Sequence, residues 1–152
     1  MKKFKFSLDT VLSYKEQVLD ALKGEHAAIL VKVREQEDYL DGLWSKYRAY
    51  NAEYSQRKIE GMTILDATIY QSGLRHMETV IQQETERLET LRKEEEAKRQ
   101  EVVEAKKETS SLDKLKEKKL DLYNKSVQKA EEILIDEFVS SARSRSGASA
   151  SA

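Results

Sequence analysis

One uninterrupted stripe of positions runs through the first third of the chain, from Leu8 to Tyr54. Each position is reached from the one before by a step of four or three residues, in strict alternation. An average spacing of 3.5 residues keeps one stripe of a helix facing a partner helix, which is the pattern of a coiled coil. The positions are Leu8, Leu12, Lys15, Leu19, Leu22, His26, Ile29, Val33, Gln36, Leu40, Leu43, Tyr47, Tyr50 and Tyr54. We call this set the seam, and it predicts one long helix paired with another.

The composition agrees with a long-helix protein. Of 152 residues, 36% are charged, 7% are aromatic and none is proline, the residue that interrupts helices most strongly. The net charge of -1 gives no general attraction to nucleic acid or to an anionic membrane. The absence of cysteine excludes a disulfide framework and fits a reducing compartment. No apolar run reaches the ~20 residues of a membrane span, and none of signal-peptide length follows the basic start, so a soluble protein is expected.

Two helices joined by a tight turn are predicted. The first covers about residues 7–58, with Ser7 as its N-cap. The turn occupies residues 59–63, where Gly61 can adopt a positive φ and Thr63 can cap the second helix. The second helix covers about residues 64–142, and the Ser- and Ala-rich segment 143–152 is predicted to be disordered because it has little to bury.

The apolar positions of the two helices agree with an antiparallel pairing. When the chain is folded about Gly61, residues whose numbers sum to about 122 face each other, so Leu40 meets Ile81 and Val33 meets Leu88. The predicted fold is therefore all-α: a long antiparallel two-helix coiled-coil hairpin over residues 1–142. The charged segment 92–100 faces the polar seam position His26, and we expect this middle part to be the softest.

Aromatic residues gather near the predicted turn. Tyr47 and Tyr54 fit the seam and are assigned to the core. Tyr39, Trp44 and Tyr50 cannot all be buried between two helices, and surplus aromatic residues are typical of partner-binding surfaces. Burial and partner binding both stay open for them. The candidates for a partner-binding surface at this end are Tyr39, Leu43, Trp44, Tyr50, Met77 and Val80.

A second apolar stripe lies beyond the predicted pairing. The register places the start of the first helix opposite Leu115, so the rest of the second helix has no helix opposite it. This part nevertheless carries apolar positions at steps of three and four, which we call the C-terminal stripe: Leu120, Tyr123, Val127, Ala130, Leu134 and Phe138. An isolated helix gains nothing from such a stripe in water. Phe4 and Phe6 can fold back over part of it, and the remainder is predicted to contact a partner.

The sequence offers no arrangement suited to catalysis. The hairpin separates His26 from His76, so the two cannot share a metal ion, and no glycine-rich phosphate loop is present. The many carboxylates are expected on solvated helices without a cleft to perturb them. We therefore predict no enzyme activity, no cofactor and no metal site.

Several segments, taken in order, resemble the flagellar export protein family FliJ, a soluble part of the type III export apparatus. The similarity covers about residues 3–140, and the Ser- and Ala-rich tail departs from it. The segments that carry it are Lys3–Leu8, Val11-Leu12, Lys15-Glu16, Tyr50, Tyr54, Gly61, Tyr70, Leu74–Gln83, Leu112–Lys119, Tyr123 and Asp136-Glu137.

The resemblance implies a coiled coil similar to the stalk subunit of rotary ATPases. It implies that the chain inserts into the hexameric export ATPase, promotes assembly of the ring, contacts the membrane export gate, and handles empty export chaperones. The C-terminal stripe would then be the contact with the ring. The implied location is the cytoplasm, at the inner face of the membrane beneath the flagellum, in motile and chemotactic cells.

Other functions make different predictions. An export chaperone or adaptor would bind flagellar subunits through the aromatic residues without affecting the ATPase. A structural spacer would dimerise through the seam, whereas a hairpin already uses the seam and is expected to be a monomer. Nucleic-acid binding is not expected.

Overall fold

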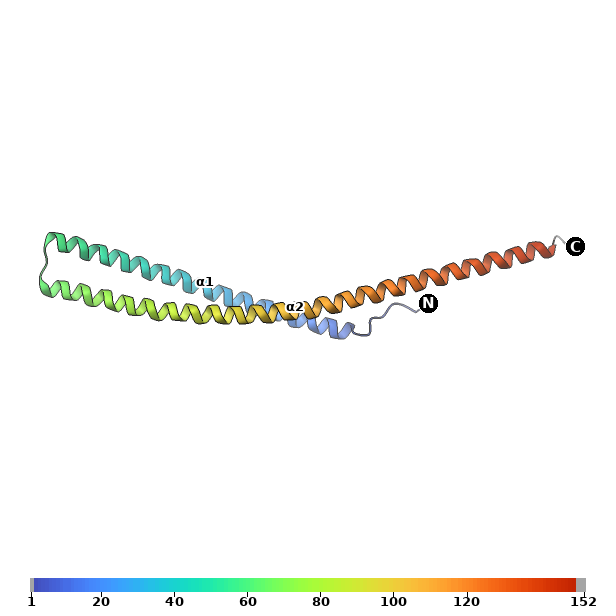
Figure 1. Ribbon diagram of the computed structural model, residues 1–152, viewed down its shortest axis with the longest axis horizontal. Helices are drawn as coiled ribbons and strands as arrows, with labels where there is room; N and C mark the ends of the chain where they lie inside the picture. Colours follow the sequence, from blue (N-terminus) through green and yellow to red (C-terminus); the bar gives the residue numbers. More distant parts are fainter. Residues whose placement is uncertain (1, 150–152) are drawn as a thin grey trace. The chain divides into compact units, whose positions relative to one another are not determined.

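The computed structural model describes residues 2–149, which form two α-helices and no strand (Figure 1). Helix α1 spans Asp9–Glu60 and helix α2 spans Ile64–Ser149. The helices turn back on each other at Gly61, so the predicted all-α antiparallel hairpin is confirmed. The boundaries at the turn lie within two residues of those expected from the sequence.

The chain forms two compact units, which are described separately. The hairpin unit comprises residues 19–104 and includes the turn. The terminal unit comprises residues 1–18 together with residues 105–152.

The turn of the hairpin unit has the local structure that its residues predict. Gly61 has a φ of 99°, which glycine adopts without the steric cost that a Cβ would impose, and its N–H donates to the Arg57 carbonyl at 2.9 Å. The Thr63 hydroxyl accepts a hydrogen bond from the Asp66 N–H at 3.1 Å and so caps α2. The glycine ends one helix and the threonine begins the next.

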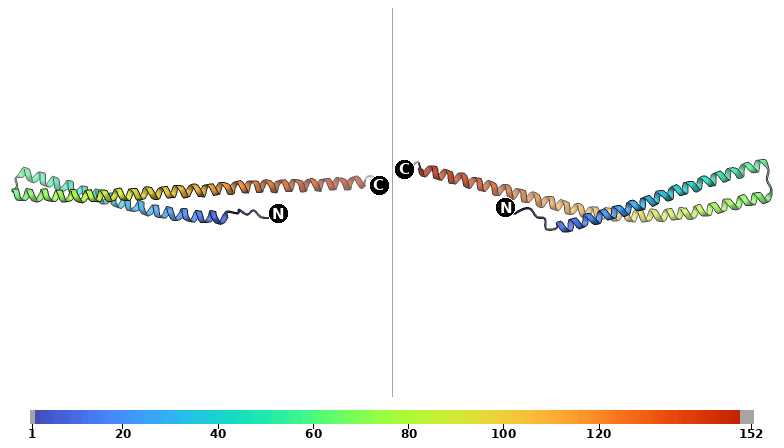
Figure 2. Two further views of the ribbon diagram at one scale, coloured as in Figure 1. Left: turned by 60° about the horizontal axis from the view of Figure 1, so that its bottom comes forward. Right: turned by 180° about the vertical axis from the view of Figure 1, so that it is seen from behind.

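Apolar residues from both helices form the core of the hairpin unit, where α1 and α2 lie side by side (Figure 2). Val33 and Leu40 of α1 pack in one buried cluster with Ile81 and Leu88 of α2. These are the pairs that the register predicts. Burial of this stripe, rather than helix propensity, is what stabilises such long helices in water.

One buried polar residue interrupts this core. Gln36 is buried on the seam, and its side-chain Nε2 donates to the backbone carbonyl of Glu84 at 3.0 Å and to its carboxylate at 2.7 Å. A polar residue at a seam position favours one register, because any slip would leave its amide without partners. Gln36 therefore helps to fix which residues of α2 face α1.

The charged part of the hairpin unit is joined by polar contacts. His26 Nε2 lies 2.7 Å from Glu95 Oε1, and both side chains are half-buried, which confirms the seam position of this histidine. Lys98 donates to Glu25 and Glu101, each at 2.9 Å, and these hydrogen bonds raise the pKa of the lysine above its ordinary value. The lower stability expected of this region stays a prediction.

In the terminal unit, the first residues of α1 pair with α2. Lys116 contacts Asp9 and Lys15 contacts Glu108, each at 2.7 Å, while Leu12 is buried. The helix begins two residues after Ser7, which lies in the preceding turn. The pairing is antiparallel, as in the hairpin unit.

The C-terminal end differs from the prediction. Helix α2 continues through residues 143–149, a segment expected to be disordered, and ends at Ser149; residues 150–152 lie outside the described part. Alanine and arginine both favour helix, and no proline stops it. All residues from 128 to 149 are exposed. Leu134, Phe138 and the other apolar side chains of this end of α2 are therefore open to solvent.

Candidate functional site: partner-binding surfaces

An apolar groove lies on the hairpin unit near the turn. Leu43 of α1 and Met77, Val80 and Ile81 of α2 line it, and it has a volume of about 180 Å³. Lys46 and His76 complete the lining. Three of the residues predicted to bind a partner, Leu43, Met77 and Val80, thus come together here. They are half-buried, so each packs on the core and presents part of its side chain.

Tyr50, also a candidate, belongs to a tyrosine cluster next to the turn. Its ring lies 5.0 Å from the Tyr70 ring, which in turn stacks on Tyr54 at 5.2 Å. Lys58 lies 3.9 Å from the centre of the Tyr54 ring, and the Arg57 guanidinium lies 6.0 Å from that of Tyr70. Tyr50 is half-buried in these contacts, so its main observed role is packing.

Gly73 makes room for the Tyr50 ring, a role that was not predicted from the sequence. A Cβ at Gly73 would lie 2.7 Å from the Tyr50 hydroxyl oxygen, closer than such atoms approach in proteins. Residues 50 and 73 face each other in the predicted register, so a glycine inside a helix opposite a large tyrosine was the available signal.

The two remaining aromatic candidates are exposed. Tyr39 is 51% exposed and Trp44 is 43% exposed. The Trp44 indole meets Tyr47 edge-on at 5.7 Å, and Trp44 lines a second groove, with Glu78, Glu86 and Glu89 of α2 among its residues. The predicted surface is thus divided, because Trp44 does not line the apolar groove with Leu43 and Met77.

Most of the C-terminal stripe is accessible to solvent. Leu134 is 66% exposed and Phe138 is 76% exposed, and Leu120 is also exposed, whereas Tyr123 and Val127 are half-buried. The stripe is wider than predicted. Further exposed apolar residues along this part of α2 are Leu122, Ile133, Ile135 and Val139.

The N-terminal segment covers the beginning of the C-terminal stripe. The Phe4 ring lies 5.6 Å from the Tyr123 ring, and the Tyr123 hydroxyl donates to the Lys2 carbonyl oxygen at 2.7 Å. Figures 1 and 2 show the segment running alongside α2. This agrees with the predicted fold-back of Phe4, but Leu134 and Phe138 lie outside its reach and stay exposed.

A comparison with protein-family models decides the family. The model of the flagellar FliJ protein family matches residues 4–148, which is nearly the whole described chain. The chain belongs to the FliJ family. The resemblance found in the sequence is thereby confirmed, and membership makes the chain a component of the flagellar export apparatus. Neither a search of curated proteins nor a search of solved structures finds a match.

Two further findings concern the residues that the structure describes. Within residues 2–149, no three His, Asp or Glu side chains are placed to hold a metal ion. Neither helix, over the same range, has a segment of the length and hydropathy needed to span a bilayer. The surfaces that present apolar side chains to solvent in this range include the apolar groove, the groove at Trp44 and the C-terminal stripe.

Proposed function

We propose that this chain is the stalk-like subunit of the flagellar export apparatus. Its C-terminal stripe enters the ring of the export ATPase and promotes ring assembly and ATP hydrolysis. Its apolar groove binds the cytoplasmic region of the export gate. The chain then works in the cytoplasm as a monomer, held at the inner face of the membrane by these partners. Membership of the FliJ family supports the setting, and the exposed surfaces suggest which residues make each contact.

The observation that carries the ring contact is the exposure of α2 from residue 128 onward. Leu134 and Phe138 lie on one side of this helix because they are four residues apart. Two such large side chains in water favour association, since burying each one removes apolar area from solvent. A helix standing free of other elements can also be surrounded by a ring, whereas a helix packed in a hairpin presents only one side.

The ring contact can be tested by placing a charge on the stripe. Leu134→Asp should abolish stimulation of the purified export ATPase, because a carboxylate cannot be buried in an apolar contact without a partner. Tyr123→Asp and Val127→Asp should act in the same direction. Leu134 is exposed, so its variant should leave the helical content unchanged by circular dichroism.

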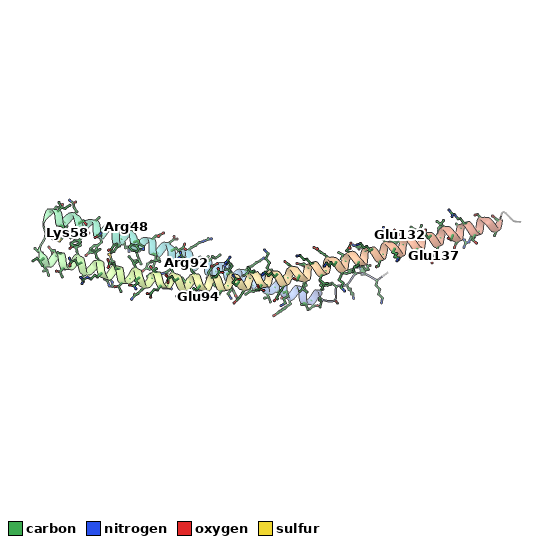
Figure 3. The ribbon with its side chains drawn as sticks, viewed as in Figure 1. Arg48, Lys58, Arg92, Glu94, Glu132 and Glu137 are labelled. Carbon is green, nitrogen blue, oxygen red and sulfur yellow. The ribbon has the colours of Figure 1, made fainter. Side chains whose placement is uncertain are left out.

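Glu132→Lys is the matched control. This residue, labelled in Figure 3, is also exposed on α2, and two residues of an α-helix place it about 200° around the helix from Leu134. The control should stimulate the ATPase within about twofold of the parent chain, as is usual for surface substitutions. A chain that ends at Leu120 and still stimulates the ATPase fully would contradict the ring contact.

The gate contact has its own test in the apolar groove. Met77→Asp should weaken binding of the export gate's cytoplasmic region by at least about 1–2 kcal/mol, the loss seen at the minority of interface residues that contribute most to binding. Thr79→Asp, at an exposed position two residues away, is the control and should bind as the parent does. A loss of helicity equal to the loss of binding would show that Met77 acts in the core instead.

The alternative function is escort of export chaperones or subunits, and the apolar groove is what favours it. An escort would bind an empty export chaperone through Leu43 and Met77 without changing ATP hydrolysis. Measuring chaperone binding and ATPase rate on the same Met77→Asp and Leu134→Asp variants separates the two functions. The stalk function predicts that Leu134→Asp alone removes the ATPase effect.

A further inference from the structure

A second groove of about 460 Å³ lies on the hairpin unit and shares only Ile81 with the apolar groove. Trp44 of α1 and Ile81 of α2 give it apolar surface. Its other lining residues are polar or acidic and all come from α2: Glu78, Gln82, Thr85, Glu86 and Glu89. We call it the acidic groove. It combines a tryptophan ring with several carboxylates, whereas the apolar groove has no acidic lining residue.

The carboxylates of this groove are not neutralised by the chain itself. Among residues 2–149, the carboxylates of Glu86 and Glu89 have no ion pair or hydrogen bond, and the Glu78 carboxylate accepts only from the Tyr47 hydroxyl, at 2.7 Å. The nearest basic residues in sequence are Arg75, Arg87, Arg92 and Lys93, and within residues 2–149 none of them forms an ion pair with these three carboxylates. Arg92 is paired with Glu37 at 3.0 Å, on the opposite side of α2 from Glu94 (Figure 3).

The tryptophan also lacks a cation that other aromatic rings of this unit have. Lys58 lies over Tyr54, and Arg57 lies over Tyr70, so the chain's own basic residues cover the tyrosine cluster. No such cation lies over Trp44 in the described chain, and Tyr47 meets it only edge-on at 5.7 Å. The indole is the aromatic ring that attracts cations most strongly.

We propose that the acidic groove binds an arginine side chain presented by a basic segment of a partner protein. The guanidinium stacks on the Trp44 ring and donates hydrogen bonds to the carboxylates of Glu86 and Glu89. Charge complementarity favours a cation over the apolar side chains that suit the groove at Met77. Arginine fits better than lysine, because its planar group can stack on a ring and donate to carboxylates at the same time.

This inference stands apart from the proposed contacts with the ATPase ring and the gate. It rests on Trp44, Glu86 and Glu89, none of which lines the apolar groove, and it holds or fails whatever occupies that groove. If it holds, the hairpin unit carries two recognition surfaces of different chemistry, and two partners can bind close to the turn.

The chain provides its own reporter, because Trp44 is the only tryptophan. The probe is the peptide acetyl-Gly-Arg-Gly-Arg-Gly-amide, titrated into the full chain while tryptophan fluorescence is recorded. A saturable change is expected, and it should weaken as salt is raised, because the contact is electrostatic and partly exposed. The same peptide with citrulline in place of arginine keeps the shape and loses the charge, so it should bind at least about tenfold more weakly.

Two sets of variants locate the binding. Glu86→Gln combined with Glu89→Gln should weaken the arginine peptide about tenfold, whereas Glu94→Gln, an exposed glutamate on α2 outside the groove, should change it less than twofold. In calorimetry, Trp44→Phe should keep most of the affinity and Trp44→Leu should lose several-fold, because only the first keeps an aromatic face. Circular dichroism of every variant checks that helicity is retained.

Three results would overturn the inference. One is the absence of a saturable signal, in fluorescence and in calorimetry, up to millimolar arginine peptide. Another is equal binding of the citrulline peptide. The last is a double glutamine variant that retains both full helicity and the parent affinity, because the carboxylates would then take no part.

Discussion

Two parts of the same helix α2 carry apolar residues at helical spacing, yet they behave differently. In the hairpin unit, Tyr70, Ile81 and Leu88 are buried against α1. Between residues 128 and 149 of the terminal unit, Leu134 and Phe138 are exposed together with everything around them. The periodicity is similar in both. Apolar periodicity predicts that one face of a helix is buried against a partner. Only the register of the pairing shows whether that partner lies in the same chain.

The largest expected difference between these parts is in stability. Ile81→Ala should lower the free energy of unfolding by about 2–4 kcal/mol, because it removes a residue that is 4% exposed from the core and leaves a cavity. Leu134→Ala should change it by less than about 0.5 kcal/mol, since this side chain is already in water. Urea unfolding followed by circular dichroism measures both.

The order of the two alanine substitutions should reverse when stimulation of the export ATPase is measured instead of stability. Leu134→Ala should reduce stimulation of the export ATPase at full stability, whereas Ile81→Ala should keep stimulation as long as the chain is folded. If Leu134→Ala proved as destabilising as Ile81→Ala, the end of α2 would be packed in solution, and the contrast between a buried and an exposed part of α2 would be wrong.

Two glutamines extend the same contrast between buried and exposed positions to polar side chains. Gln36 is buried and hydrogen-bonded to Glu84, so Gln36→Ala should cost about 1–2 kcal/mol of unfolding free energy. Gln128 is exposed and donates to Glu132 at 3.2 Å, and Gln128→Ala should be neutral within about 0.5 kcal/mol. Equal effects in thermal unfolding would mean that the Gln36 amide contributes no more than a solvated one.

A pair of glycines tests packing within the hairpin unit. Gly42→Ala adds a methyl group in open space and should stabilise the helix by about 0.5–1 kcal/mol. Gly73→Ala gives the same gain in propensity but must displace the Tyr50 ring from Tyr70, so it should be less stable than Gly42→Ala by about 1 kcal/mol. The aromatic signal in near-ultraviolet circular dichroism should change only for Gly73→Ala.

The sequence predicted the fold well because few features determine it. An unbroken seam without proline specifies two helices, Gly61 and Thr63 specify the turn, and the pairing of Leu40 with Ile81 then follows. The surfaces were predicted less well. Trp44 and Leu43 are neighbours in sequence and were assigned to one partner-binding surface. Neighbouring residues of a helix lie about 100° apart around its axis, however, and these two line different grooves.

The end of α2 and the role of Gly73 were harder to predict for separate reasons. Composition suggested disorder after residue 142, but without proline the helix continues to Ser149. The need for glycine at position 73 depends on where the Tyr50 ring lies against the Tyr70 ring. A ring position of this kind is set by packing and cannot be read from residue spacing. The cover that Phe4 forms over Tyr123 was foreseen because two aromatic residues close to the start of α1 had few other places to pack.

The smallest expected effect is a loss of stability at high pH in the hairpin unit. The hydrogen bond to Glu78, with some burial, raises the pKa of Tyr47 above 10.0, and burial followed by the hydrogen bond to Glu53 raises the pKa of Tyr70. A raised pKa in the folded state favours the neutral phenol. The contribution of each phenol to stability is therefore full below pH 10.0 and is lost as the pH rises through the pKa of the folded state.

Tyr47→Phe should make the unfolding free energy less dependent on pH above 10. A chain that ends at Val127, which lacks the exposed part of α2, should keep the pH dependence of the parent chain. Unfolding curves at several alkaline pH values measure this. An alkaline loss that disappears with the shortened chain would assign it to the exposed end of α2 instead.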